Sequence, residues 1–283
     1  MMKNVLTGLL AAAMAVSILA GCGNDGGSKT AKVIDIALTD EQYAFGVDKT
    51  QPELMESVNA FIKEINENGT FEEICDHYFG DGTPVAVKSA AYDESKDQLV
   101  VATNASFEPF EYIDGDSYYG IDMEIAARLA EYLNKELVIQ NMDFEAVCLS
   151  VGQQKCDIAM AGLTVREDRM EYVDFSDAYY NASQVLIVAS DDKDFDGCTD
   201  AASVEAILKE KGSSAKIGAQ NGTTGLFYAE GDEDWGFEGF GAQVTGYKNG
   251  SLAVQDLLNG NIDYVIIDSA PAACITEAIN KLQ

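Results

Sequence analysis

The chain has 283 residues, and its 48 acidic and 18 basic residues give a formal net charge of −30 at pH 7. A surface this acidic repels phosphate backbones and anionic lipid headgroups, which argues against nucleic acid and direct binding to a membrane surface. With His77 as its single histidine, the chain has almost nothing from which to build a Cys/His zinc cluster or a histidine-based catalytic triad, so we expect no metal and no cofactor.

The chain begins MMKNVLTGLLAAAMAVSILAGC, with one lysine, a run without charge and a small residue before Cys22. Residues 1–21 are predicted to be a signal peptide, because the apolar run is shorter than the roughly 20 residues of a membrane-spanning helix. LAGC resembles a bacterial lipobox, which implies lipidation of Cys22; an ordinary secretory cleavage site is the alternative. The polar residues 22–31 predict a flexible tether, so we expect an extracytoplasmic protein anchored to the cell membrane by lipid.

Five cysteines remain besides Cys22: Cys75, Cys148, Cys156, Cys198 and Cys274. Because the number is odd, at least one thiol is free or paired with another chain. Their spacings match no metal site, and most of them are expected as buried, apolar residues.

The first predicted elements are two strands, KVIDIALT and EQYAFGVDK, followed by a helix from Pro52. The apolar residues on one face of this helix are Leu54, Val58, Phe61, Ile62 and Ile65. A shorter helix, TFEEICDHYF, is expected to have Thr70 as its N-cap. Residues 80–97 lack periodicity and are rich in Gly, Ser, Asp and Lys, which predicts a linker.

Strands and helices alternate from residue 98 onward, with QLVVATN, ELVIQNM and CDIAMAG as strands. One intervening helix is expected to be capped by Asp122, and another runs through Val147 and Val151. From ASQVLIVAS the same alternation continues to a final helix at about 271–281. This pattern predicts an α/β protein of two lobes with mostly parallel sheets covered by helices on both faces.

Several stretches resemble the amino-acid-binding proteins of ABC importers, the polar-amino-acid branch of the periplasmic-binding-protein superfamily. They include ATNASFEPFEY, YYGIDMEIAARLA, IGAQNGTTG and, most specifically, the run from Gly162 to Tyr180. The resemblance implies a two-lobed type II fold and a solute-binding lipoprotein. Such a protein is a monomer without enzymatic activity that passes an amino acid to the membrane subunits of an ABC importer.

The order of the segments differs from that family, in which the segment resembling residues 98–283 comes first and the one resembling 33–80 comes last. The sequence therefore resembles a circular permutant, with residues 80–97 joining the ancestral termini. A gene-assembly artefact or a truncated tandem is the alternative. We expect one lobe over 43–188 and the other over 32–42 and 189–283, with hinge crossovers near 41–45 and 187–190.

An amino-acid zwitterion needs a cation for its carboxylate and an anion for its ammonium. By resemblance, Arg169 forms a two-pronged contact with the carboxylate, and Thr224 lies at a helix start whose N–H groups favour an anion. Asp268, the hydroxyl of Thr164 and the carbonyl of Gly162 match the positions that hold the ammonium. Taken alone, Arg169 could be a surface ion-pair partner and Asp268 a helix cap.

The ligand's side chain would lie between the rings of Phe107 and Phe144, which could otherwise be ordinary core residues. Asn104 and Gln220 match positions that read the far end of that side chain. Asn104 stands where binders of cationic amino acids often have a carboxylate. No additional Arg or Lys is evident that would bind the side chain of an acidic amino acid. The resemblance therefore favours a polar or uncharged amino acid. Arg166 matches a position that does not contact the ligand.

The main alternative function is a secreted dehydratase-like enzyme on the same fold, since such enzymes resemble these binding proteins throughout. It would need a general acid or base facing the cleft, and His77 lies outside every cleft motif. A sensor module is a second alternative.

Overall fold

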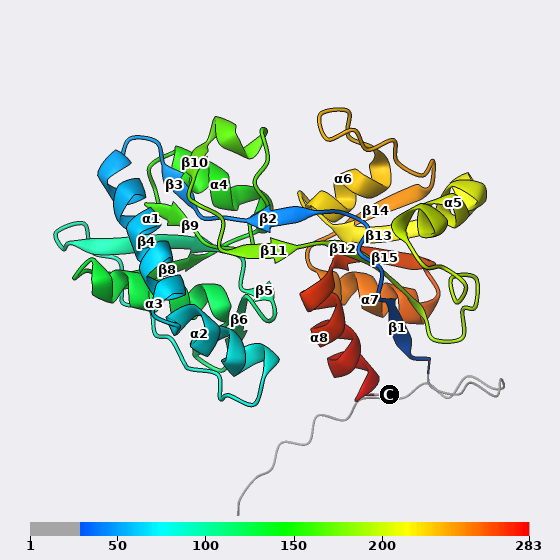
Figure 1. Ribbon diagram of the computed structural model, residues 1–283, viewed down its shortest axis with the longest axis horizontal. Coiled ribbons are helices and arrows are strands. Elements are labelled where there is room, and N and C mark those ends of the chain that lie inside the picture. The colour runs from blue at the N-terminus through cyan, green and yellow to red at the C-terminus, as the bar shows by residue number, and fades with distance from the viewer. Residues whose placement is uncertain (1–28, 283) are drawn as a thin grey trace, which may run out of the picture.

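The computed structural model describes residues 29–282, so the expected signal peptide, Cys22 and most of the tether lie outside the described residues. Two lobes lie side by side, each with a five-stranded sheet and helices packed against it (Figure 1). This is the two-lobed α/β architecture predicted from the sequence. Among the helices of the described part, none combines the length and apolarity needed to cross a bilayer.

The first lobe has a sheet of strand order β10-β3-β9-β4-β8. Its strands are β3 (Gly46–Asp48), β4 (Gln98–Thr103), β8 (Glu136–Asn141), β9 (Ile158–Ala159) and β10 (Val173–Phe175). Its helices are α1 (Pro52–Glu67), α2 (Thr70–Phe79), α3 (Ile121–Tyr132), α4 (Phe144–Gly152) and the 3-10 turn η1 (Arg169–Glu171). A smaller sheet is formed by β5 (Ser106–Phe107), β6 (Glu111–Asp114) and β7 (Ser117–Tyr119).

The second lobe has a sheet of order β1-β12-β15-β13-β14. Its strands are β1 (Ala31–Ile34), β12 (Gln184–Ala189), β13 (Lys216–Gln220), β14 (Gln243–Tyr247) and β15 (Tyr264–Asp268). Its helices are α5 (Ala201–Lys211), η2 (Gly212–Ser214), α6 (Thr224–Glu230), α7 (Gly250–Asn259) and α8 (Ser269–Asn280).

Two strands connect the lobes: β2 (Glu41–Tyr43) pairs antiparallel with β11 (Tyr180–Ala182), and Figure 1 shows both running between the two sheets. The crossover expected near 187–190 is therefore wrong, as is the end of the first lobe at residue 188. The apolar strand β12 is buried in the second sheet, where it pairs with β1 and β15. The second crossover thus lies at β11.

The expectation of mostly parallel sheets is also wrong. In each sheet one strand pairs parallel with two neighbours: β4 with β8 and β9, and β13 with β14 and β15. The strands that follow the hinge, β3 and β12, pair antiparallel with both of their neighbours. Two sequential parallel strands must be joined by a long crossover connection. A strand that enters the sheet from the other lobe needs no such connection and can pair antiparallel with its neighbours.

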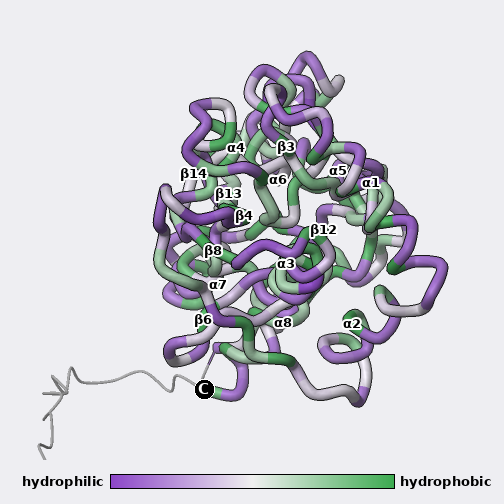
Figure 2. The backbone as a smooth tube through the Cα atoms, turned by 90° about the vertical axis from the view of Figure 1, so that its left-hand side faces the viewer, coloured by the Kyte–Doolittle hydropathy of each residue, from purple (hydrophilic) through white to green (hydrophobic). Residues whose placement is uncertain are grey.

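Helix α1 buries all five of the apolar residues predicted for its inner face. Figure 2 shows hydrophilic segments along most of the peripheral loops, as expected when the apolar side chains pack between helices and sheets. Two expected caps are wrong: Gly69 and Gly120 occupy the N-cap positions of α2 and α3. Thr70 is the first residue of α2, and Asp122 makes a different contact, described below.

The segment 80–97, predicted as a linker, is fixed along the first lobe. Val87 forms a bridge with Tyr118, and the N–H of Ala90 donates to the carbonyl of Leu137 at 2.9 Å. In the second lobe, the side chain of Asn280 at the end of α8 donates to the carbonyl of Ala31 at 2.8 Å and accepts from its N–H at 2.9 Å. The start of β1 and the end of α8 are thus hydrogen-bonded to one another.

Candidate functional site

A small cavity lies between the lobes, with a free volume of about 10 Å³, which is roughly the space of one water molecule. All nine residues that the sequence analysis assigned to a ligand line this one cavity, and Thr223 completes the lining. They are Asn104, Phe107, Phe144, Gly162, Thr164, Arg169, Gln220, Thr224 and Asp268.

Both lobes contribute to the lining, mostly from the ends of strands or the starts of helices. In the second lobe, Gln220 and Asp268 end β13 and β15, and Thr224 begins α6. In the first lobe, Phe144 begins α4 and Arg169 begins η1. Strand ends are where ligands bind in open α/β sheets.

Arg169 is a buried cation that forms no ion pair with any residue the structure describes. Its side chain is largely buried, with 7% of the residue exposed. One Nη atom donates to the carbonyl of Thr164 at 2.7 Å, and the other donates across the cleft to the carbonyl of Gly222 at 3.1 Å. Within residues 29–282 no carboxylate lies at ion-pairing distance from its guanidinium, because the neighbouring Asp168 pairs with Arg166. Burial lowers the pKa of Arg169, which reflects the cost of this isolated charge.

Asp268 is a buried carboxyl group that lines the cavity from the second lobe. It occupies the N-cap position of α8, yet its side chain forms no capping hydrogen bond and instead accepts one from the Tyr43 hydroxyl at 2.6 Å. Burial, and then the charge of nearby Glu41, raise the pKa of Asp268 to about 7. Among the described residues no Lys or Arg forms an ion pair with it.

Glu41 and Tyr43, both on the hinge strand β2, hydrogen-bond to residues of the cavity lining, and the sequence analysis missed this supporting role. The Glu41 carboxylate is 2% exposed and accepts hydrogen bonds from Thr39 Oγ1 at 2.6 Å, Thr164 Oγ1 at 2.6 Å and Gln184 Nε2 at 3.0 Å. Because Thr164 and Gln184 lie more than 120 residues away along the chain, no local pattern could have indicated these contacts.

Asp122 supports a residue of the cavity lining through a buried hydrogen bond. Its carboxylate accepts from the N–H of Gly162 at 2.9 Å and from the Tyr179 hydroxyl at 2.6 Å. Burial raises its pKa to about 7, and these two hydrogen bonds act in the opposite direction. The residue predicted to cap α3 therefore positions the Gly162 turn, where φ is +53°.

Two amide side chains meet at one end of the cavity. Asn104 Nδ2 donates to the carbonyl of Met142 at 2.7 Å, which fixes the orientation of the Asn104 amide and leaves its oxygen to accept from Gln220. Gln220 Nε2 donates to that oxygen at 3.0 Å. This leaves Gln220 Oε1 buried and without a hydrogen-bond partner among the described residues, and the same holds for the Thr224 hydroxyl. The cavity thus has an unused acceptor at Gln220.

Comparison with known families gives a match to the bacterial extracellular solute-binding proteins, family 3, over residues 99–271. The arginine-binding extracellular protein ArtP of Bacillus subtilis is 32% identical over 135 residues, which cover 46% of this chain and 53% of that protein. A probable histidine-binding protein of Neisseria gonorrhoeae is 28% identical over 177 residues, covering 61% of this chain and 59% of that one. The chain thus spans little more than half the length of these two relatives.

Similar solved structures include the ancestral amino acid-binding protein AncCDT-1, a precursor of cyclohexadienyl dehydratase. It has a TM-score of 0.55 at 27% identity, covering 65% of this chain and 75% of that one. An ancestral arginine-binding protein bound to glutamine has a TM-score of 0.53 at 28% identity, with coverages of 65% and 74%.

Proposed function

Because the chain belongs to family 3 of the bacterial extracellular solute-binding proteins, we propose that it captures a free amino acid between its two lobes. One observation carries this proposal: the buried guanidinium of Arg169 and the buried carboxyl of Asp268 line the same cavity without partners of opposite charge in the described residues. Isolated buried charges are costly, and a ligand that neutralises both removes that cost. A zwitterion does so, with its carboxylate on Arg169 and its ammonium near Asp268.

Neighbouring groups support this orientation. The Thr224 hydroxyl has no hydrogen-bond partner in the described part of the chain and can donate to the carboxylate. Thr164 already donates its hydroxyl proton to Glu41, so its oxygen is left to accept a hydrogen bond from the ammonium. The carbonyl of Gly162 provides a second acceptor.

We further propose that the ligand's side chain carries a hydrogen-bond donor. Gln220 Oε1 is the unused polar atom at the amide end of the cavity, and an acidic side chain would place a charged acceptor against it. The relatives support the same chemistry, since their names specify arginine and histidine, and one similar structure contains glutamine. All three side chains end in N–H groups.

In this proposal the ligand favours a closed arrangement of the lobes, because contacts from both lobes are complete only when they meet. The closed, loaded protein is then recognised by the membrane subunits of an ABC importer. Lipidation at Cys22 and an extracytoplasmic location complete the proposal, and the family's extracellular members support the location. We propose a monomer.

We also propose that the chain is a circular permutant. The hydrogen bonds between Asn280 and Ala31 support it, since they join the end of α8 to the start of β1. The family match begins only at residue 99, which leaves β1 to α2 outside it. A chain rebuilt with residues 32–80 after residue 283 should bind the same amino acid with similar affinity. Failure of that chain to fold would contradict the permutation.

A dehydratase-like enzyme is the second candidate, and AncCDT-1 is the similar structure that favours it. Asp268 and Glu41 are two buried carboxyl groups, and the charge of Glu41 acts on Asp268. However, both Glu41 oxygens already accept hydrogen bonds, which suits a fixed structural anion better than a proton donor. We therefore favour binding over catalysis.

The proposal is tested by thermal-shift screening of the purified protein against the twenty amino acids, followed by calorimetry. Glutamine and glutamate give the most decisive comparison, because they match in size, whereas the glutamine amide can donate a hydrogen bond and the glutamate carboxylate can only accept one. We expect glutamine to bind at least about tenfold more tightly. Preference for glutamate would contradict the side-chain assignment, and absence of any binding would contradict the function. Turnover of a bound amino acid or of a cyclohexadienyl acid would favour the enzyme.

A further inference from the structure

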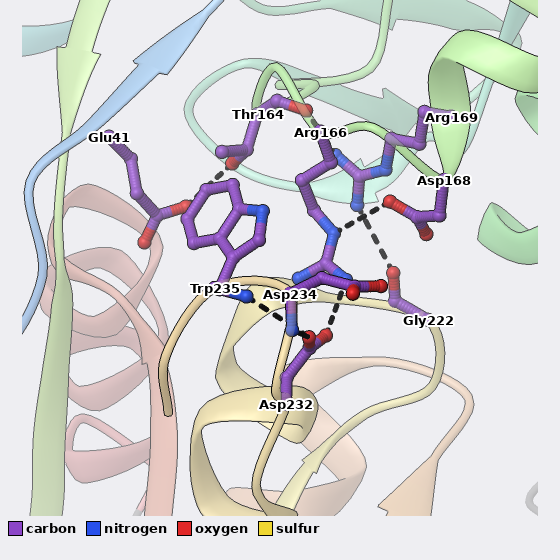
Figure 3. A network of polar contacts seen from close by, with 9 residues as sticks. All are labelled: Glu41, Thr164, Arg166, Asp168, Arg169, Gly222, Asp232, Asp234 and Trp235. Atoms are coloured by element: carbon purple, nitrogen blue, oxygen red, sulfur yellow. Dashed lines mark hydrogen bonds and ion pairs between the residues drawn. The ribbon is translucent and has the colours of Figure 1, made fainter. Parts of the chain in front are cut away.

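Arg166 lies in the first lobe but is held mainly by the second. It is 4% exposed, and its Nε donates to Asp168 of its own lobe at 2.9 Å. Its Nη2 donates across the cleft to Asp232 at 2.8 Å (Figure 3). The guanidinium carbon lies 4.3 Å from the ring centre of Phe227 and 5.0 Å from that of Trp235. Three of its four partners therefore belong to the other lobe.

The segment that receives Arg166 has its own internal support. Asp232 Oδ1 accepts from the N–H groups of Asp234 and Trp235 at 3.0 and 3.3 Å, while Oδ2 binds the arginine. Asp232 also pairs through its backbone with Phe237. This arrangement fixes one carboxylate oxygen and one aromatic ring toward the first lobe, so the guanidinium meets a preformed acceptor.

Arg166 does not line the cavity proposed for the amino acid. Its second-lobe contacts exist only while the lobes are together, and opening would leave it with Asp168 alone. We infer that Arg166, Phe227, Asp232 and Trp235 form an interlobe latch that stabilises the closed arrangement and slows release of the ligand. In this role Arg166 is a positioning residue: it changes how long any ligand is held without choosing between ligands. The release part of the inference rests on the proposed function, whereas the closure part does not.

The test compares Arg166→Gln and Asp232→Asn with the wild-type full chain. Both variants remove the ion pair from opposite sides, so a folding defect in one does not decide the result. Arg128→Gln is the matched control, because the Arg128 side chain is 42% exposed and its one ion pair among residues 29–282 is with Glu73 of its own lobe at 3.6 Å. Stopped-flow measurement with the tightest-binding amino acid should show dissociation faster by roughly 5- to 150-fold for both variants, the range of typical coupling free energies. The double variant should be little faster than either single one.

Two further readouts separate the latch from a contact with the ligand. The ratio of dissociation constants for two different amino acids should stay unchanged in Arg166→Gln, whereas substitution of Gln220 should change it. In ligand-free protein, small-angle X-ray scattering should give a larger radius of gyration for both variants than for wild type. Dissociation rate constants within about twofold of wild type would overturn the latch. If wild type binds no amino acid, the proposed function fails and an unchanged radius of gyration overturns the latch separately.

Discussion

The hydroxyl of Tyr43 donates a 2.6 Å hydrogen bond to the carboxyl group of Asp268, joining the hinge strand β2 to the end of β15. Burial raises the pKa of Asp268, and this hydrogen bond opposes that effect by stabilising the ionised form. The hinge thus contributes to keeping a negative charge available for an ammonium group.

Tyr43→Phe should weaken amino-acid binding by roughly tenfold or more, since hydrogen bonds to charged groups contribute about 1.5–3 kcal/mol. It should also raise the pKa of Asp268 further, because the stabilising donor is lost. Calorimetry at several pH values measures both effects. Tyr180→Phe is the control, because Tyr180 stacks on Tyr43 at 5.7 Å in the partner strand. An unchanged affinity in Tyr43→Phe would show that the Tyr43 hydroxyl does not contribute to amino-acid binding.

Binding should strengthen as pH rises from about 5 to 8. Below its pKa of about 7, Asp268 is protonated and must lose a proton to hold an ammonium group. Calorimetry at pH 6 in two buffers of different ionisation enthalpy should therefore detect proton release. Asp268→Asn should abolish the release and most of the affinity. Proton uptake on binding would contradict this assignment.

The ligand-free protein should show the opposite trend in stability. Between 3.8 and about 7 the folded Asp268 holds more protons than it does in the unfolded chain, so its contribution to the free energy of unfolding falls as pH rises. Asp122, with a pKa also near 7, acts in the same direction. Melting temperatures at pH 5 and 8, with and without ligand, should show that the ligand's stabilisation increases with pH. Equal stabilisation at both values would argue against ionisation of Asp268 on binding.

Arg169→Ala should abolish measurable binding, because truncating one partner of a buried charge pair costs about 2–5 kcal/mol. Arg169→Lys should recover little, since lysine cannot reproduce the planar, two-pronged contact. Calorimetry checks both variants, with Arg128→Ala at a half-buried position of α3, outside the cavity lining, as control. Retained affinity in Arg169→Ala would refute the carboxylate contact on which the proposed function depends.

Gly162→Ala should lower both stability and affinity. At φ +53° an added Cβ is strained, and it would lie 2.9 Å from Cε1 of Phe107 in the wall of the cavity. Gly115→Ala is a matched control, because φ is +60° there and no atom lies within 4 Å. Thermal melts should show a loss of about 1 kcal/mol for the control and more for Gly162→Ala. Only Gly162→Ala should weaken binding in calorimetry. If the two variants bind the amino acid with equal affinity, the Phe107 ring moves aside without changing the site.

The sequence allowed prediction of those features that depend on local pattern or on motif resemblance. The inner face of α1 follows from apolar spacing, and the nine assigned residues gather in one cavity because they end strands or begin helices of a shared architecture. Asp122 was misread because a carboxylate near a helix start usually caps it, whereas here the Gly162 turn uses it. Glu41 and Arg166 depend on partners in distant segments, which no periodicity records.

The hinge strand β2 carries Glu41 and Tyr43, so the pivot of the two lobes also holds Thr164 and Asp268 of the proposed binding cavity. A substitution there would alter the angular range of the lobes together with ligand choice. In this protein the evolution of new selectivity through the hinge would be inseparable from a change in the speed of opening.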